Sequence, residues 1–145
     1  RCVKTEECAL QFDGLTFTRS KGDTFIDEPY DPDIIRRWKA TRLSHSFDEP
    51  VSVVWRSLDG SVHRAVIDLT DIFKDRQVLH VVPRDEVAPM ADGEYQHLPG
   101  ILVEVNDRRV HVYMRAFIPT RHLQRKGGPQ SDYRWDLILA RSYTF

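Results

Sequence analysis

The chain has 145 residues, of which 41% are hydrophobic and 30% are charged, and its formal net charge is -1. These values are typical of an ordinary globular protein, and the length predicts a single domain over residues 1–145. The near-zero charge disfavours a general nucleic-acid or membrane-surface binder, because such proteins are normally clearly basic. No run approaches the roughly 20 apolar residues that span a bilayer. The chain opens without Met or a signal peptide, so we expect a trimmed mature region.

The two cysteines, Cys2 and Cys8, lie close together at the N-terminus. A disulfide between them would close a small loop and restrict the unfolded chain by about 2 kcal/mol. It would also imply an oxidising compartment. Two alternatives stay open: two free thiols, or a lipid on one cysteine, as in a bacterial lipoprotein. The lipid alternative requires Arg1 to be foreign to the native N-terminus, because arginine is the wrong residue to precede a lipidated cysteine.

The next part of the chain combines a predicted strand with an acidic segment. Leu15–Arg19 alternates apolar and polar residues, which predicts a strand that ends in a turn at residues 21–23. Residues 23–33 then carry five carboxylates. The pair Asp31-Pro32 is typical of a helix start, so we expect a short helix that ends at Ala40.

Residues 51–69 predict a β-hairpin with its turn at Asp59-Gly60. A two-residue turn at this pair places Val53 opposite Val66 and Trp55 opposite Arg64. Both faces of the ribbon are then mixed, so we expect it to be covered on both sides or to sit centrally in a sheet.

Three further short elements are expected. Thr70 would cap one helical turn over residues 70–76, residues 78–82 would form a short strand, and residues 135–143 would form the last strand. Long irregular stretches at 84–100 and 120–133 separate these elements, and long loops in a small domain are usually functional or disordered.

The hairpin over residues 101–119 is the best-specified element. A turn at Asp107-Arg108 aligns Val105 with Val110 and makes one face wholly apolar. On the other face Glu104 lies opposite His111, which is typical of an exposed cross-strand ion pair. The elements together predict a mainly β fold, either an antiparallel β-sandwich or an α+β fold with two hairpins and one or two short helices.

No stretch of the chain matches a catalytic or cofactor-binding signature. The sequence contains no GxSxG, P-loop, GxGxxG or HExxH motif, and its six histidines are scattered without an i, i+4 pair. We therefore expect a protein that is not an enzyme and that holds no metal and no cofactor.

The strongest candidate for a binding surface is the acidic segment, together with acids in the stretch 84–100. Such a surface suits a basic partner protein, because opposite charge speeds encounter and buried aromatic residues supply affinity. The alternative is a solvated loop whose charges only keep the protein in solution. The candidate partner-binding residues are Asp23, Phe25, Asp27, Glu28, Tyr30, Asp31, Asp33, Asp85, Glu86 and Asp92. Arg121, Arg125 and Lys126 make a basic patch too small for a nucleic-acid partner.

Four strings carry a resemblance to a known bacterial family: WRSLDGSVHRAVIDLTDIF at 55–73, MADGEY at 90–95, ILVEVNDRRVHVYMRAFIPT at 101–120 and DLILARSYTF at 136–145. Over residues 50–145 the chain resembles the small periplasmic lipoproteins that act as immunity proteins against type VI secretion phospholipase effectors. The resemblance implies a periplasmic protein that binds a cognate lipase and blocks its active site. It also implies a lipid anchor on an N-terminal cysteine. No inhibitory residue can be carried over, because the sequence displays no invariant inhibitory motif.

Two other functions are weighed against this one. A small β-rich secreted module could bind a lipid or another apolar ligand, with Trp55, Tyr113, Phe117 and Trp135 lining the cavity. The third alternative is a hydrolase with a dispersed site that involves His63, His80 or His111, although no nucleophile lies in a recognisable motif.

Overall fold

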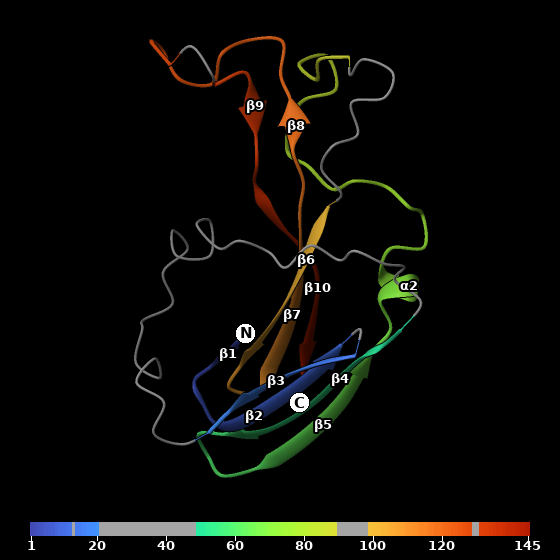
Figure 1. Cartoon of the computed structure of the whole chain (residues 1–145), viewed down its shortest axis with the longest axis vertical. Coiled ribbons are helices and arrows are strands. Elements are labelled where there is room, and N and C mark those ends of the chain that lie inside the picture. Colours follow the sequence, from blue (N-terminus) through green and yellow to red (C-terminus); the bar gives the residue numbers. More distant parts are fainter. Residues whose placement is uncertain (13, 21–48, 90–98, 129–130) are drawn as a thin grey trace.

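A computed structural model describes residues 1–12, 14–20, 49–89, 99–128 and 131–145. These residues form two four-stranded sheets and one two-stranded ribbon (Figure 1). In order across the sheet, sheet A contains β1 (Cys2–Val3), β6 (Gly100–Asn106), β7 (Arg109–Arg115) and β10 (Leu137–Thr144). Sheet B contains β3 (Leu15–Arg19), β2 (Thr5–Phe12), β4 (Val51–Ser57) and β5 (Val62–Ile67). The ribbon pairs β8 (Ile118–Pro119) with β9 (Tyr133–Arg134).

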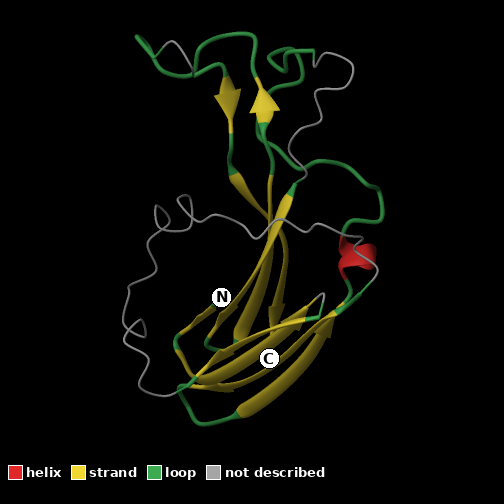
Figure 2. Cartoon of the chain, viewed as in Figure 1, coloured by secondary structure: helices red, strands yellow, loops and turns green. Residues whose placement is uncertain are grey.

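The predicted mainly β fold is confirmed, and Figure 2 shows how strongly strands dominate the described chain. Neighbouring strands run antiparallel except for β1, which pairs with β6 in parallel. The two sheets share one buried cluster, to which sheet B contributes Val53 and Trp55 and sheet A contributes Val105, Val110 and Val112. Two sheets that bury their inner faces against each other make a β-sandwich.

The β6–β7 hairpin has the predicted register, with Val105 opposite Val110 and Glu104 opposite His111. Its two-residue turn places Asp107 at φ 52°, a left-handed conformation that Asp tolerates better than most residues. The same turn meets sheet B, because the indole N–H of Trp55 donates a hydrogen bond of 2.6 Å to the carbonyl of Asp107. This contact fixes the largest side chain of the core across both sheets.

The predicted register of the β4–β5 hairpin is wrong by one residue. Val53 pairs with Ala65 and Trp55 pairs with His63, because the loop contains three residues, Leu58–Gly60, rather than two. Gly60 supplies the left-handed residue of this loop, with φ 83°. A shift of one residue turns every side chain of β5 to the other face. The ribbon therefore has one buried face instead of two mixed faces.

The N-terminal residues form two strands that the sequence did not suggest. β1 belongs to sheet A and β2 to sheet B, and Lys4 turns the chain between them at φ 49°. The disulfide between Cys2 and Cys8 is confirmed, with an S–S distance of 2.05 Å. It joins the two sheets of the sandwich and uses both cysteines of the chain.

Three of the smaller predictions need correction. The short helix α2 (Leu69–Ile72) is capped by the Asp68 carboxylate and not by Thr70. Residues 78–82 form no strand. The last strand begins at Leu137, and its register shifts between Leu139 and Arg141, which ends the predicted alternation. The helix expected from Asp31 lies outside the described residues, which contain no helix long and apolar enough to cross a membrane.

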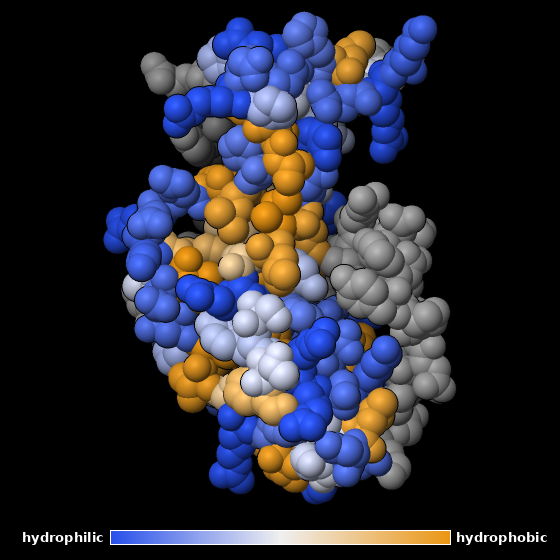
Figure 3. Space-filling view, turned by 180° about the vertical axis from the view of Figure 1, so that it is seen from behind, coloured by the Kyte–Doolittle hydropathy of each residue, from blue (hydrophilic) through white to orange (hydrophobic). Residues whose placement is uncertain are grey.

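A hairpin projects from one end of the sandwich as a continuation of β7 and β10 (Figure 1). We call residues 116–128 and 131–136 the arm; it includes β8 and β9. A second small cluster at its base contains Val82, Ala116 and Ile118. Seen from behind, apolar side chains gather at the neck between the sandwich and the arm (Figure 3).

Candidate functional site

Most of the predicted partner-binding residues lie outside the part of the chain that the structure describes. This holds for Asp23, Phe25, Asp27, Glu28, Tyr30, Asp31, Asp33 and Asp92, so their role stays a prediction. Asp85 and Glu86 are described, and they lie in the segment that runs beside the arm. Asp85 is exposed, whereas Glu86 is partly buried.

Glu86 holds the arm in place. Its carboxylate accepts a hydrogen bond of 3.0 Å from the backbone N–H of His122, and its other oxygen lies 2.8 Å from Nδ1 of the same residue. The hydrogen bond with the His122 side chain lowers the pKa of Glu86. Backbone bonds from Arg121 to Glu86 and from Ala88 to Pro119 extend the same junction. Glu86, one of the acids predicted to bind a partner protein, therefore binds His122 of the same chain.

The arm carries a hollow of about 450 Å³ in which cationic and aromatic side chains meet. We call it the arm hollow. Its lining includes Arg115, Arg125, Tyr133, Arg134 and Trp135. Arg115 comes from the end of β7 and Trp135 from the residues just before β10. The guanidinium carbon of Arg115 lies 5.1 Å from the centre of the Trp135 ring, a distance at which the ring attracts the cation.

The aromatic residues around the arm hollow pack against one another. Phe117 stacks on Tyr133 with ring centres 5.0 Å apart and meets Trp135 edge-on at 6.2 Å. Tyr133 and Trp135 are nevertheless 40% and 42% exposed. They therefore offer large, pre-positioned aromatic surfaces to a ligand or partner.

Two arginines of the arm hollow are held differently. Arg134 donates two hydrogen bonds of 2.8 Å to the Asp136 carboxylate, which raise the pKa of its guanidinium. Burial lowers the pKa of Arg115. Both groups remain cationic at neutral pH, because their ordinary pKa lies far above it. The arm hollow can thus bind carboxylates or other anions through fixed guanidinium groups.

Ser57 and His63 lie close together, but their arrangement locks a turn. The Ser57 hydroxyl lies 2.5 Å from the Asp59 carboxylate and 3.0 Å from Nε2 of His63. Since the single hydroxyl proton is given to the carboxylate, the imidazole N–H donates to Ser57 and does not act as its base. This bond to Ser57 lowers the pKa of Asp59 to about 2. The Ser57 side chain is also fully buried, so the group is placed to hold the β4–β5 loop.

The pair Glu104 and His111 differs from the exposed ion pair that was predicted. Glu104 is fully buried although it lies on the face of β6 opposite to Val103 and Val105. Neither of its carboxylate oxygens has a hydrogen-bond partner among the described residues. Burial raises the pKa of Glu104, an effect that the nearby charge of Arg1 opposes, and burial lowers the pKa of His111. Both shifts favour the neutral forms.

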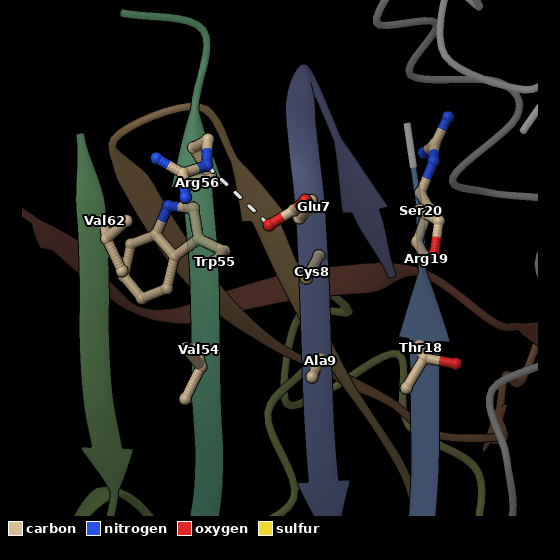
Figure 4. Close-up of a pocket in the computed structure, with 10 residues that line it drawn as sticks. All are labelled: Glu7, Cys8, Ala9, Thr18, Arg19, Ser20, Val54, Trp55, Arg56 and Val62. Atoms are coloured by element: carbon tan, nitrogen blue, oxygen red, sulfur yellow. Dashed lines mark ion pairs between the residues drawn. The ribbon is translucent and has the colours of Figure 1, made fainter. Parts of the chain in front are cut away.

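The outer face of sheet B holds a smaller hollow of about 270 Å³ (Figure 4). An ion pair of 3.7 Å between Glu7 and Arg56 spans neighbouring strands there, beside Val54 and Val62. Both charged side chains are well exposed, so the pair contributes little to stability. The two valines give this face a small apolar area, without a convergent set of polar groups.

The four aromatic residues expected around an apolar cavity lie in different places. Trp55 is buried in the sandwich core beside His63 and Phe145. Phe117 and Trp135 belong to the arm, and Tyr113 packs near His111 on sheet A. These residues therefore do not line one common cavity.

The arm hollow was not found from the sequence, and the reason is its assembly from separate segments. Arg115, Arg125 and Trp135 are far apart in the chain and meet only because β8 and β9 extend the β7–β10 pairing. One local signal was present: aromatic and charged residues alternate over Tyr133–Asp136 directly after a long polar loop. The described residues contain no group of three or more His, Cys, Asp and Glu that could hold a metal ion.

Comparison of the chain with protein-family models, with curated proteins and with solved structures found no match.

Proposed function

We propose that this chain is an immunity protein that binds a cognate type VI secretion phospholipase effector in the periplasm and occludes its active site. The observation that carries the proposal is the arm. It projects beyond the sandwich (Figure 1). It also presents exposed tryptophan, tyrosine and arginine side chains. These three residue types dominate the binding energy of protein interfaces. The choice of a phospholipase effector as the partner rests on the resemblance of residues 50–145 to such immunity proteins.

The construction of the fold suits an inhibitor that acts by occlusion. The disulfide and the Trp55 contact hold the two sheets together, and Glu86 fixes the arm to the neighbouring segment. A projection that is already ordered loses little conformational entropy when it enters a cleft, which favours tight binding. A stable complex of this kind buries about 1,600 Å² in total.

The proposal is tested by mixing the purified protein with a phospholipase encoded beside its gene. We expect a one-to-one complex in size-exclusion chromatography with light scattering. We also expect loss of phospholipid hydrolysis when the two proteins are equimolar. The matched control is an unrelated secreted phospholipase, which should stay active. A mixture that elutes as two separate proteins at tens of micromolar, with hydrolysis unchanged, would contradict the proposal.

A further inference from the structure

We infer that the arm hollow is the surface that receives the partner, and that it binds acidic side chains of the partner protein. This inference rests on the proposed function and adds to it the chemistry of the contact. It differs from the expectation that the acidic segment 23–33 faces a basic partner. Three features of the molecule support it: the order of the arm, its charge and the position of the guanidinium groups around the arm hollow.

The arm is ordered before any partner arrives. Its strands pair Ile118 with Arg134 and Pro119 with Tyr133. Beyond them the loop is closed by hydrogen bonds of 2.7 Å from Thr120 to Asp132 and from Gln124 to Ser131. The Ser131 hydroxyl also accepts from the backbone N–H of Arg125 at 3.0 Å. The cationic side chains therefore extend from a fixed backbone.

The arm is basic although the whole chain carries a net charge of -1. It contains four cationic side chains and two carboxylates: Arg121, Arg125, Lys126 and Arg134 against Asp132 and Asp136. One of these carboxylates, Asp136, is already bound by Arg134. Glu86 of the neighbouring segment hydrogen-bonds to His122 and also interacts electrostatically with Arg121. Among the described residues, the arm thus carries more cationic side chains than carboxylates.

The arrangement around Trp135 favours carboxylates on a protein as the ligand. Arg115 lies over the Trp135 ring, and this cation–π contact restricts the position of its guanidinium group. An oriented guanidinium binds a carboxylate through two parallel hydrogen bonds, and the exposed rings beside it can pack against apolar side chains of the same partner. A net charge of -1 disfavours approach to an anionic membrane, whereas a protein loop can contact the arm alone.

The test measures the affinity of the phospholipase for three variants by calorimetry. Arg125→Glu reverses an exposed charge in the arm hollow and leaves the backbone bonds to Ser131 intact. Trp135→Ala removes the aromatic surface. The matched control is Arg64→Glu, which makes the same charge change on an exposed residue of β5. Thermal unfolding of each variant verifies that it is folded.

We expect Trp135→Ala to weaken binding about thirtyfold, as at a typical interface hot spot. Arg125→Glu should weaken it at least tenfold, and Arg64→Glu should bind within twofold of the wild type. Raising NaCl from about 0.1 M to about 0.5 M should weaken binding of the wild type more than binding of Arg125→Glu. Salt screens the attraction between Arg125 and the partner's carboxylates, and the variant lacks this attraction.

The outcomes separate this inference from the proposed function. If the wild type binds and both arm variants bind equally well, the inference is wrong and the proposed function stands. If the wild type forms no complex, the proposed function fails and the inference fails with it. Binding of the wild type to phosphatidylglycerol vesicles, lost in Arg125→Glu while lipase binding is unchanged, would assign the arm to a lipid surface and overturn the inference.

Discussion

Removing the disulfide tests how the two sheets are held together. Cys2 lies in β1 of sheet A and Cys8 in β2 of sheet B, six residues apart in sequence. Replacing both by serine removes a small closed loop and so increases the conformational entropy of the unfolded chain. In the loop-entropy model this lowers the free energy of unfolding by about 2 kcal/mol. For a chain of this length that loss lowers the melting temperature by about 4–8 °C.

The structure adds a local consequence to this global one. β1 is only two residues long, and its pairing with β6 rests on Cys2 opposite Val105 and Val3 opposite Asn106. Without the disulfide, we expect β1 to open before the rest of the sandwich. The amides of residues 2–4 should then exchange hydrogen faster, while those of β4 and β7 should keep their protection.

The assay is urea unfolding of the oxidised wild type, the reduced wild type and the Cys2→Ser/Cys8→Ser variant. The two forms without the disulfide should have the same free energy of unfolding. This value should be about 2 kcal/mol lower than that of the oxidised protein. Equal stability of all three forms would contradict this prediction, because it would mean that the disulfide does not reduce the conformational freedom of the unfolded chain.

Three further changes test the packing and the electrostatics, each by urea unfolding. Glu104→Gln should stabilise the protein at pH 7.5 and have a smaller effect near pH 4.5. Because burial raises the pKa of Glu104, the protonated side chain contributes to the free energy of unfolding at low pH. This contribution is lost as the pH rises through the pKa of Glu104 in the folded protein. Trp55→Phe should cost about 1–3 kcal/mol, since it leaves the Asp107 carbonyl without the indole donor. Asp68→Ala should cost about 1 kcal/mol, since it removes the cap of α2.

Each of these changes has a control and a contradicting result. The control for Glu104→Gln is Glu7→Gln, at an exposed carboxylate, which should show no pH-dependent gain in stability. A Glu104→Gln variant that is less stable than the wild type at pH 7.5 would contradict the effect expected from burial. For Trp55→Phe, unchanged stability would mean that the bond to Asp107 contributes nothing. Asp71→Ala is the control for the cap, because it removes an acidic side chain of the first turn but keeps the backbone N–H that donates to Asp68. An equal loss of stability in both variants would contradict the assignment.

The sequence predicted the fold wherever local patterns settle the structure. The β6–β7 hairpin was predicted with its register, because valines alternate on both sides of a short polar turn. The β4–β5 register was missed, because Asp59-Gly60 suits a two-residue turn and also the end of a three-residue loop, and only packing decides between them. β2 was missed because glutamates and cysteines near a chain end resemble a frayed terminus.

Less of the candidate site than of the fold could be predicted from the sequence. Local composition drew attention to the acids at 23–33, whereas the arm hollow depends on the distance between Arg115 and Trp135 in the folded chain. Burial of Glu104 was missed for a related reason. Strand alternation places the residue on the outer face of sheet A but does not say whether that face is covered. Contacts between segments that are distant in sequence decided both cases.

Hydrogen–deuterium exchange of the complex with the phospholipase is the most direct test that the arm is the contact surface. We expect the amides of residues 118–125 and 131–136 to gain protection on binding, while those of β5 in sheet B do not change. Protection confined to residues 23–33, with the arm exchanging as in the free protein, would contradict it.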